Sequence, residues 1–234
     1  MRVNEHTGEI GGHVKGWTCG DVMFELHAGQ PHELPKHAHS AWQIGTTTRD
    51  PGRYVIDGRA TDAPPGSMLV FAPGQVHSAA KAVRSTSAHS RIMFVSDEKL
   101  RAAAAALTGR NSAVPSFGDS RISDTAFIAR FCHLHRLVSE EWSASTLEKE
   151  SCLVEVLAAL IERFGKVVAA LPEGRLGVVK TRTVRDYVES NYSESITLSQ
   201  LAELAHVSPC HLNRTFAQEV GMPPHAFQTQ VRVD

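Results

Sequence analysis

The hydrophobic pattern of this chain changes its period once, close to residue 96. From Trp17 to about Val95, short runs rich in β-branched and aromatic residues are separated by Gly and Pro, which is typical of strands. After Ser96, apolar residues recur at the three-to-four spacing of a helix face. One element cannot satisfy both periods, so the sequence predicts an α+β protein in which the strands come first.

The strand-rich part, residues 1–95, is predicted to form a domain of its own. Asp57-Gly58 lies between two strand-like runs and predicts a two-residue hairpin, because a type I′ turn needs positive φ at both central residues. Further turns are expected at Pro64–Ser67 and at Ala72–Gln75. About seven strands at this spacing favour a sandwich or a barrel over alternating strand–helix units.

Residues 96–164 form the predicted helical segment, and its last helix carries two apolar stripes. The first stripe comprises Leu147, Ser151, Val154, Leu157, Ile161 and Phe164, and the second comprises Leu153, Val156 and Leu160. One stripe can face the β domain, whereas the other needs a different cover, for which a twofold copy of the same helix is the simplest. We therefore expect a dimerisation segment and a homodimer; burial of both stripes inside one subunit is the alternative.

Composition excludes several classes of protein. The first fifteen residues are polar, and no later stretch approaches the roughly eighteen apolar residues of a membrane span, so we expect a cytoplasmic protein with no membrane partner. The net charge of −1 does not by itself indicate a nucleic-acid partner. Free thiols rather than disulfides or a zinc finger are predicted from the wide spacing of the four cysteines, Cys19, Cys132, Cys152 and Cys210.

The C-terminal part predicts a linker followed by a helix-turn-helix. Residues 165–177 contain Pro and Gly but few large apolar side chains, which is typical of a linker. Within residues 178–234, a helix from about Leu198 to Ala205 precedes a short turn and a second helix. Ser208-Pro209 marks the start of that helix, as N-cap and first helical residue, and Gly221 marks its end.

Two groups of residues resemble a known family. The C-terminal group resembles the first helix-turn-helix of AraC-type transcription regulators: Leu201-Ala202, Ala205, Ser208, His211-Leu212, Arg214, Phe216, Gly221, Pro224 and Arg232. The N-terminal group resembles the cupin-type sensor barrel of the same family: His37-x-His39, Tyr54, Asp57-Gly58, Pro65-Gly66 and Phe71 to His77. The resemblance implies a regulator rather than an enzyme, with double-stranded DNA and a small-molecule effector as partners.

The resemblance also implies which residues read DNA. It places the helix that starts at Pro209 in the major groove, with Cys210, His211, Asn213 and Arg214 exposed toward the bases and Ser208 beside them. Asn can pair with adenine and Arg with guanine, each pair worth roughly 1 to 3 kcal/mol of discrimination. A solvated or salt-bridged Arg214 is the alternative.

Two features limit the electrostatic attraction to DNA and the size of the reading surface. Residues 178–234 carry more acidic than basic side chains: Asp186, Glu189, Glu194, Glu203, Glu219 and Asp234 against Lys180, Arg182, Arg185, Arg214 and Arg232. The family normally has two helix-turn-helix units, and the second is expected to be missing here. Either the sequence is a natural or cloned truncation, or a dimer presents one unit to each of two half-sites one helical turn apart. A third alternative is a truncated sensor that dimerises but no longer binds DNA.

Three histidines of the predicted barrel fall where a cupin enzyme would place metal ligands. They are His37, His39 and His77, and Gln43 occupies the position at which such enzymes generally carry Glu. Because Gln is a poor replacement for an anionic carboxylate ligand, we expect an effector pocket with Trp42 as an apolar wall, and no metal or other cofactor. Structural histidines and a metal site remain open, and a metal-dependent cupin enzyme is the rival function.

Overall fold

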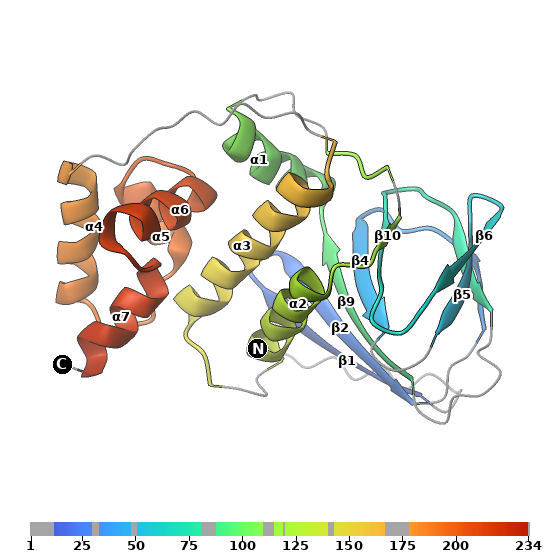
Figure 1. Cartoon of the computed structure of the whole chain (residues 1–234). Helices are drawn as coiled ribbons and strands as arrows, with labels where there is room; N and C mark the ends of the chain where they lie inside the picture. The colour runs from blue at the N-terminus through green and yellow to red at the C-terminus, as the bar shows by residue number, and fades with distance from the viewer. Residues whose placement is uncertain are drawn as a thin grey trace. The chain divides into compact units, whose positions relative to one another are not determined.

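The computed structural model describes residues 12–29, 33–47, 51–80, 88–109, 115–118, 120–139, 143–166 and 178–233 (Figure 1). Ten strands are assigned in these ranges: β1 Gly12–Cys19, β2 Val22–Gly29, β3 Leu34–His37, β4 Trp42–Thr47, β5 Gly52–Ile56, β6 Arg59–Ala63, β7 Met68–Phe71, β8 His77–Ala80, β9 Ala88–Val95 and β10 Arg121–Ile122. The helices are α1 Asp97–Thr108, α2 Thr125–Val138, α3 Thr146–Phe164, α4 Val178–Ser190, α5 Leu198–Leu204, α6 Pro209–Val220 and α7 Pro224–Val233. The predicted α+β class, with its strands first, is confirmed.

The chain divides into two compact units that do not follow its linear order. The first comprises the described residues within 1–99 and 117–141, and the second those within 100–116 and 142–234. Helix α3 therefore belongs with the C-terminal helices α4 to α7. Most of the predicted linker, from residue 167 to residue 177, lies outside the described residues. No helix in the described part of the chain is long and apolar enough to cross a bilayer.

The first unit is built from two antiparallel sheets. The larger has the strand order β1-β2-β9-β4-β7-β10 and the smaller has the order β3-β8-β5-β6. In the larger sheet, Phe24, Met93 and Ile44 are register partners and are fully buried, so they form one face of the sheet. Residues one position along each strand point to the opposite face.

The hairpin predicted at Asp57-Gly58 is confirmed. It joins β5 to β6, and its two central residues have φ values of 49° and 80°. Asp57 is one of only two non-glycine residues with positive φ among those described, and Asp tolerates this region better than most residues. The hairpin positions β5, and the register of β5 with β8 in turn places Ile56 opposite His77.

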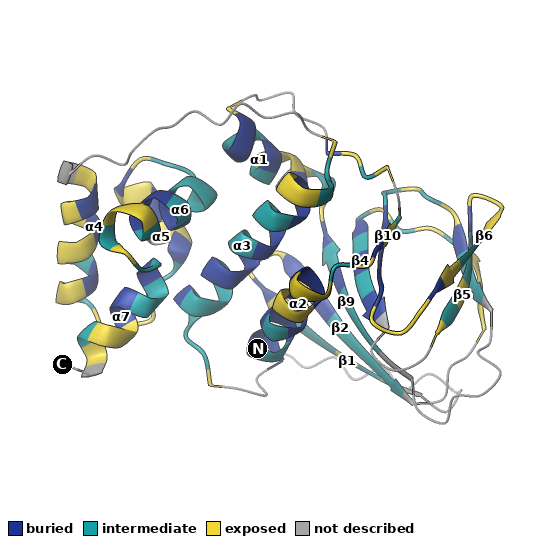
Figure 2. Ribbon diagram, viewed as in Figure 1, coloured by how far each residue is buried: buried dark blue, intermediate teal, exposed yellow. Residues whose placement is uncertain are grey.

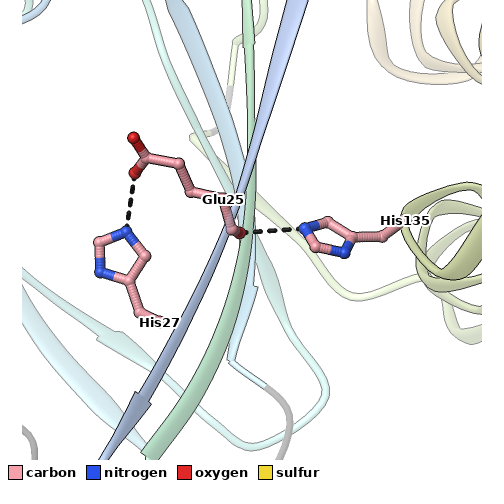
Figure 3. A network of polar contacts seen from close by, with 3 residues as sticks. All are labelled: Glu25, His27 and His135. Atoms are coloured by element: carbon pink, nitrogen blue, oxygen red, sulfur yellow. Dashed lines mark hydrogen bonds and ion pairs between the residues drawn. The ribbon is translucent and has the colours of Figure 1, made fainter. Parts of the chain in front are cut away.

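Helix α2 packs on the apolar face of the larger sheet through a buried histidine. The ring of His135 lies edge-on to Phe24 and Trp17, with centroid distances of 5.8 and 6.0 Å. Its Nε2 donates a hydrogen bond to the backbone carbonyl of Glu25 at 3.0 Å (Figure 3). Burial lowers the pKa of His135 to about 4, so the ring is neutral at pH 7 and links α2 to β2 without a buried charge.

The second unit confirms the local signals of the helix-turn-helix. Ser208 caps α6 by accepting from the His211 amide, Pro209 follows it, and α6 ends at Gly221 with a φ of 86°. At the start of α5, Thr197 and Gln200 form a capping box. The carbonyls of Tyr192 and Glu194, which precede α5, accept hydrogen bonds from side chains of α7: Gln228 bonds both, and Arg232 bonds both.

Both apolar stripes of α3 are largely buried within one chain (Figure 2). Leu147 lies in the same core cluster as Val184, Leu201, Leu212 and other residues of the helix-turn-helix, and Val154 packs against that cluster. Helix α3 contacts α5, α6 and α7. The prediction of a second copy of α3 rested on one stripe lacking a cover within the chain. Both stripes are instead largely buried within a single chain, as the alternative of intramolecular burial stated.

Candidate effector and DNA-binding sites

Three of the predicted site histidines come together between the two sheets of the first unit. His37 ends β3 and is the register partner of His77 at the start of β8, and His39 follows in the next loop. Their ring centroids are 4.3 Å apart for His37 and His77, 5.0 Å for His37 and His39, and 5.3 Å for His39 and His77. One nitrogen from each ring lies within 4.8 Å of the others. This spacing suits a small ligand or a metal ion held by all three rings.

Aromatic side chains form the apolar wall of this histidine cluster. Phe71 stacks on His77 with a centroid distance of 4.0 Å and an interplanar angle of 10°, and Phe94 lies edge-on to His39 at 5.2 Å. Gln43 is the register partner of both phenylalanines and so shares their face of the sheet. Gln43 also raises the pKa of His39, so the two side chains lie near one another. The predicted grouping of Gln43 with the histidines is therefore what the structure shows.

Trp42 does not join this group, although the sequence led us to expect it as the apolar wall. Successive residues of a strand point to opposite faces, so Trp42 and Gln43 cannot line the same space. Trp42 is 6% exposed, donates from Nε1 to Asp97 Oδ1 at 3.0 Å, and packs edge-on to Phe117. It is a core residue of the opposite face.

Glu25 and His27 lie on the same face as the histidine cluster and were missed from the sequence. Both alternate along β2 with Met23, whose register partner is Phe94. Glu25 pairs with His27, with Oε2 and Nε2 2.8 Å apart (Figure 3). The Glu25 carboxylate also acts electrostatically on His39. The sequence alternation of Met23, Glu25 and His27 predicts that these side chains share one face of β2. Which face of the sheet that is depends on the pairing of β2 with β9.

Burial keeps two of the rings neutral. It lowers the pKa of His39, as does the neighbouring His37, while Glu25 and Gln43 offset part of the effect. Burial also lowers the pKa of His77, partly offset by the hydrogen bond to the Gln75 carbonyl. Neutral imidazoles present lone pairs, which accept hydrogen bonds or bind metals.

The hydrogen bonds to backbone carbonyls determine which nitrogens face the site. A carbonyl only accepts, so the contacts His77 Nδ1 to Gln75 O at 3.0 Å and His37 Nδ1 to Pro35 O at 2.7 Å place a proton on each Nδ1. The Nε2 atom of neutral His77 is then an acceptor. It is buried, as is Gln43 Oε1, and neither atom has a hydrogen-bond partner among the described residues. Buried acceptors without a partner are costly and favour a bound donor.

The structure places the predicted DNA-reading residues on α6 but does not leave them all exposed. Asn213 is 3% exposed and donates from Nδ2 to Glu155 Oε1 of α3 at 3.3 Å. Arg214 Nη1 lies 4.0 Å from Oε1 of Glu162, which also belongs to α3. This is the salt bridge that was predicted as the alternative role of Arg214. The expectation of a solvent-facing reading surface is therefore wrong for Asn213.

The other predicted reading residues are partly buried. Burial raises the pKa of the Cys210 thiol to about 11. Burial, together with nearby Arg214 and Lys180, lowers the pKa of His211. The hydroxyl of Ser208 accepts from the His211 amide at 3.2 Å and so serves as the helix cap. Of the predicted reading residues, Asn213 and Arg214 thus contact α3 side chains, whereas Cys210 and His211 are partly exposed.

Comparison with known proteins identifies both units. The family described as the AraC-like ligand binding domain matches residues 22–157, and the family of bacterial regulatory helix-turn-helix proteins, AraC family, matches residues 188–229. The uncharacterized HTH-type transcriptional regulator YbfI of Bacillus subtilis is 26% identical over 208 residues, which are 88% of this chain and 73% of that protein. AdaA of the same organism, a bifunctional transcriptional activator and DNA repair enzyme, is 38% identical over 50 residues, which are 21% of this chain and 24% of its own length.

Among solved structures, the AraC-like transcriptional activator CuxR is similar over 99% of this chain and 84% of its own, with 15% identity and a TM-score of 0.48. The ligand-binding family alone covers more than half of the chain, and the helix-turn-helix family follows it in the order that the sequence predicted. The chain belongs to the AraC family of transcription regulators, with a ligand-binding domain followed by a DNA-binding helix-turn-helix.

Proposed function

We propose that the effector of this regulator binds at the histidine cluster and that α6 reads DNA. The observation that carries the effector site is that two buried acceptors, His77 Nε2 and Gln43 Oε1, have no partner in the described part of the chain, near the aromatic wall of Phe71 and Phe94. A ligand with hydrogen-bond donors and an apolar face would satisfy both features. With Glu25 on the same face, the site favours a neutral or cationic donor, such as a polyol or an amine, over an anion.

Thermal shift of the purified protein against neutral polyols, amines and carboxylic acids tests this site. We expect stabilisation by members of the first two classes and its loss in His77→Ala and Gln43→Ala. His13→Ala, which replaces an exposed histidine on β1, is the matched control and should respond as the wild type does. Stabilisation by carboxylic acids alone, or an unchanged response in both site variants, would contradict the proposal.

A divalent metal ion is the second candidate for the same site, because one nitrogen from each of three rings lies within 4.8 Å of the others. We favour the organic effector because the fourth group, Gln43, is neutral, so the site lacks the anionic ligand that would offset a metal's charge. Elemental analysis of the purified protein, compared with a His37→Ala, His39→Ala double variant, separates the two. Stoichiometric metal that is lost in the double variant would support a metal site and reopen the rival of a metal-dependent enzyme.

We also propose a cytoplasmic homodimer without catalytic activity of its own as the working form. Two copies of α6 related by a twofold axis could each enter one of two half-sites about one helical turn apart. This geometry, rather than the apolar stripes of α3, which are covered within the chain, is the support for the dimer. Sedimentation in the presence of operator DNA should give two chains per duplex; one chain per duplex would contradict the dimer.

A further inference from the structure

We propose that acidic side chains of α3 hold the DNA-reading face of α6 in a closed arrangement that excludes DNA. The acidic latch is defined here as Glu155 and Glu162. The inference rests on the proposed role of α6 as the DNA-reading helix. Both helices belong to the same compact unit.

The latch engages the two side chains best suited to reading bases. Glu155 accepts a hydrogen bond from Asn213 at 3.3 Å, and Glu162 pairs with Arg214 at 4.0 Å. Asn and Arg are the residues that pair bidentately with adenine and guanine, so each carboxylate occupies a group that DNA would need. Glu162 also acts electrostatically on the Cys210 thiol, which lies on the same face of α6.

The two latch residues lie along one side of α3. Glu155 and Glu162 are seven residues apart, which is about two turns and roughly 10 Å along the helix, so they share one side of α3. Further toward the start of α3, Glu150 accepts a hydrogen bond from the Leu198 amide at the N-terminus of α5. Thr146 Oγ1 lies 3.1 Å from Ser195 Oγ, just before α5. Helix α3 therefore contacts both helices of the helix-turn-helix.

The closed arrangement and a DNA complex cannot coexist. A recognition helix must enter a groove about 12 Å wide, and a second helix packed on its reading face leaves no room for the base edges. The carboxylates would also meet the phosphate backbone as like charges. Leu147 of α3 also lies in the shared core, and this apolar contact is separate from the latch.

The latch is imperfectly satisfied, which makes it suited to opening. Asn213 Oδ1 and Arg214 Nε are buried without a hydrogen-bond partner among the described residues. Such atoms cost free energy in the closed state, and base edges in the open state could pair with them. In a contact that only stabilises the fold, we would expect these buried polar atoms to have hydrogen-bond partners.

The test neutralises the latch without removing its bulk. In Glu155→Gln, Glu162→Gln, affinity for a duplex from upstream of the protein's own gene should rise roughly tenfold, because apparent affinity scales with the open fraction. Affinity for a random-sequence duplex should rise similarly. The control, Glu33→Gln, Glu98→Gln, removes the same two charges at exposed positions of the first unit and should change either affinity by less than about twofold.

Thiol labelling provides a readout that does not involve DNA. Cys210 is the one partly exposed cysteine, because Cys19, Cys132 and Cys152 are buried, and its raised pKa makes it a slow nucleophile in the closed state. Opening should speed its reaction with a chromogenic disulfide reagent several-fold in the latch variant but not in the control. Because Glu162 itself raises the Cys210 pKa, Glu155→Gln alone is the variant in which faster labelling reports opening rather than the loss of a nearby charge.

The two readouts separate the possible failures. Faster labelling together with tighter DNA binding supports the latch. Faster labelling with no DNA binding by any variant would refute the assignment of α6 as the reading helix, on which the proposal rests. Unchanged labelling in a latch variant, when the wild type binds DNA, would overturn the latch itself.

Discussion

Acidification from pH 7.5 to pH 5 should destabilise the first unit through His135. This ring is fully buried, contacts Phe24 and Trp17, and donates to the Glu25 carbonyl (Figure 3). Protonation would place a charge in that apolar contact, and burial accordingly lowers its pKa from 6.5 to about 4. Because the folded pKa is depressed, the stabilisation is complete above pH 6.5 and is lost as the pH falls toward 4.

The magnitude follows from the two pKa values. The full shift corresponds to about 3 kcal/mol, at roughly 1.4 kcal/mol for each pKa unit. At pH 5 the unfolded ring is almost fully protonated and the folded ring is mostly neutral, so we expect a loss of about 2 kcal/mol relative to pH 7.5. Two other histidines with lowered pKa, the buried His77 and the partly buried His39, add a further loss in the same direction.

Urea unfolding followed by tryptophan fluorescence measures this loss, because Trp17 and Trp42 both lie in the first unit. His135→Gln retains a neutral donor but cannot titrate, so it isolates the contribution of the ring. The decrease between pH 7.5 and pH 5 should be smaller in the variant by about 2 kcal/mol. An identical pH dependence in both proteins would refute the assignment of a buried neutral imidazole.

Three further outcomes are expected. Gln43→Glu should increase the affinity for Zn²⁺ or Mn²⁺ at least tenfold by calorimetric titration, since it adds the missing anionic ligand; unchanged affinity would show that the three rings do not form a metal site. Arg214→Ala should reduce the discrimination between operator and unrelated duplex by about 1 to 3 kcal/mol in anisotropy titrations, and equal discrimination would mean that Arg214 does not read a base. Leu147→Ala should destabilise the second unit by about 2 to 5 kcal/mol in denaturant unfolding, whereas Leu204→Ala, at an exposed position, should cost far less; similar losses would argue against Leu147 as a core residue of that unit.

The features predicted correctly from the sequence depend on short-range rules. The Asp57-Gly58 hairpin and the Ser208-Pro209 start of α6 are each decided by the backbone preferences of a few adjacent residues. The family resemblance also predicted the order of the two domains and the histidines of the sensor. His37, His39 and His77 were correctly grouped with Gln43, because these residues match the family's sensor motif.

The errors arose where long-range pairing decides the outcome. The order Trp42-Gln43 shows that the two side chains point to opposite faces, but the pairing of β4 with β7 and β9 decides which face meets the histidines. Likewise, the pairing of β2 with β9 brings Glu25 to that face. The apolar stripes of α3 were evident from the sequence, whereas their cover was decided by tertiary packing.

The sequence by itself therefore determined the local elements, their order and the chemistry available on each strand and helix, because these depend on residues close together in the chain. Only the tertiary structure decided which side chains share the effector site and that Glu155 and Glu162 meet Asn213 and Arg214. The physical reason is that strand register and helix packing are set by the burial of apolar surface between distant segments. That burial selects one arrangement among several that the local pattern allows.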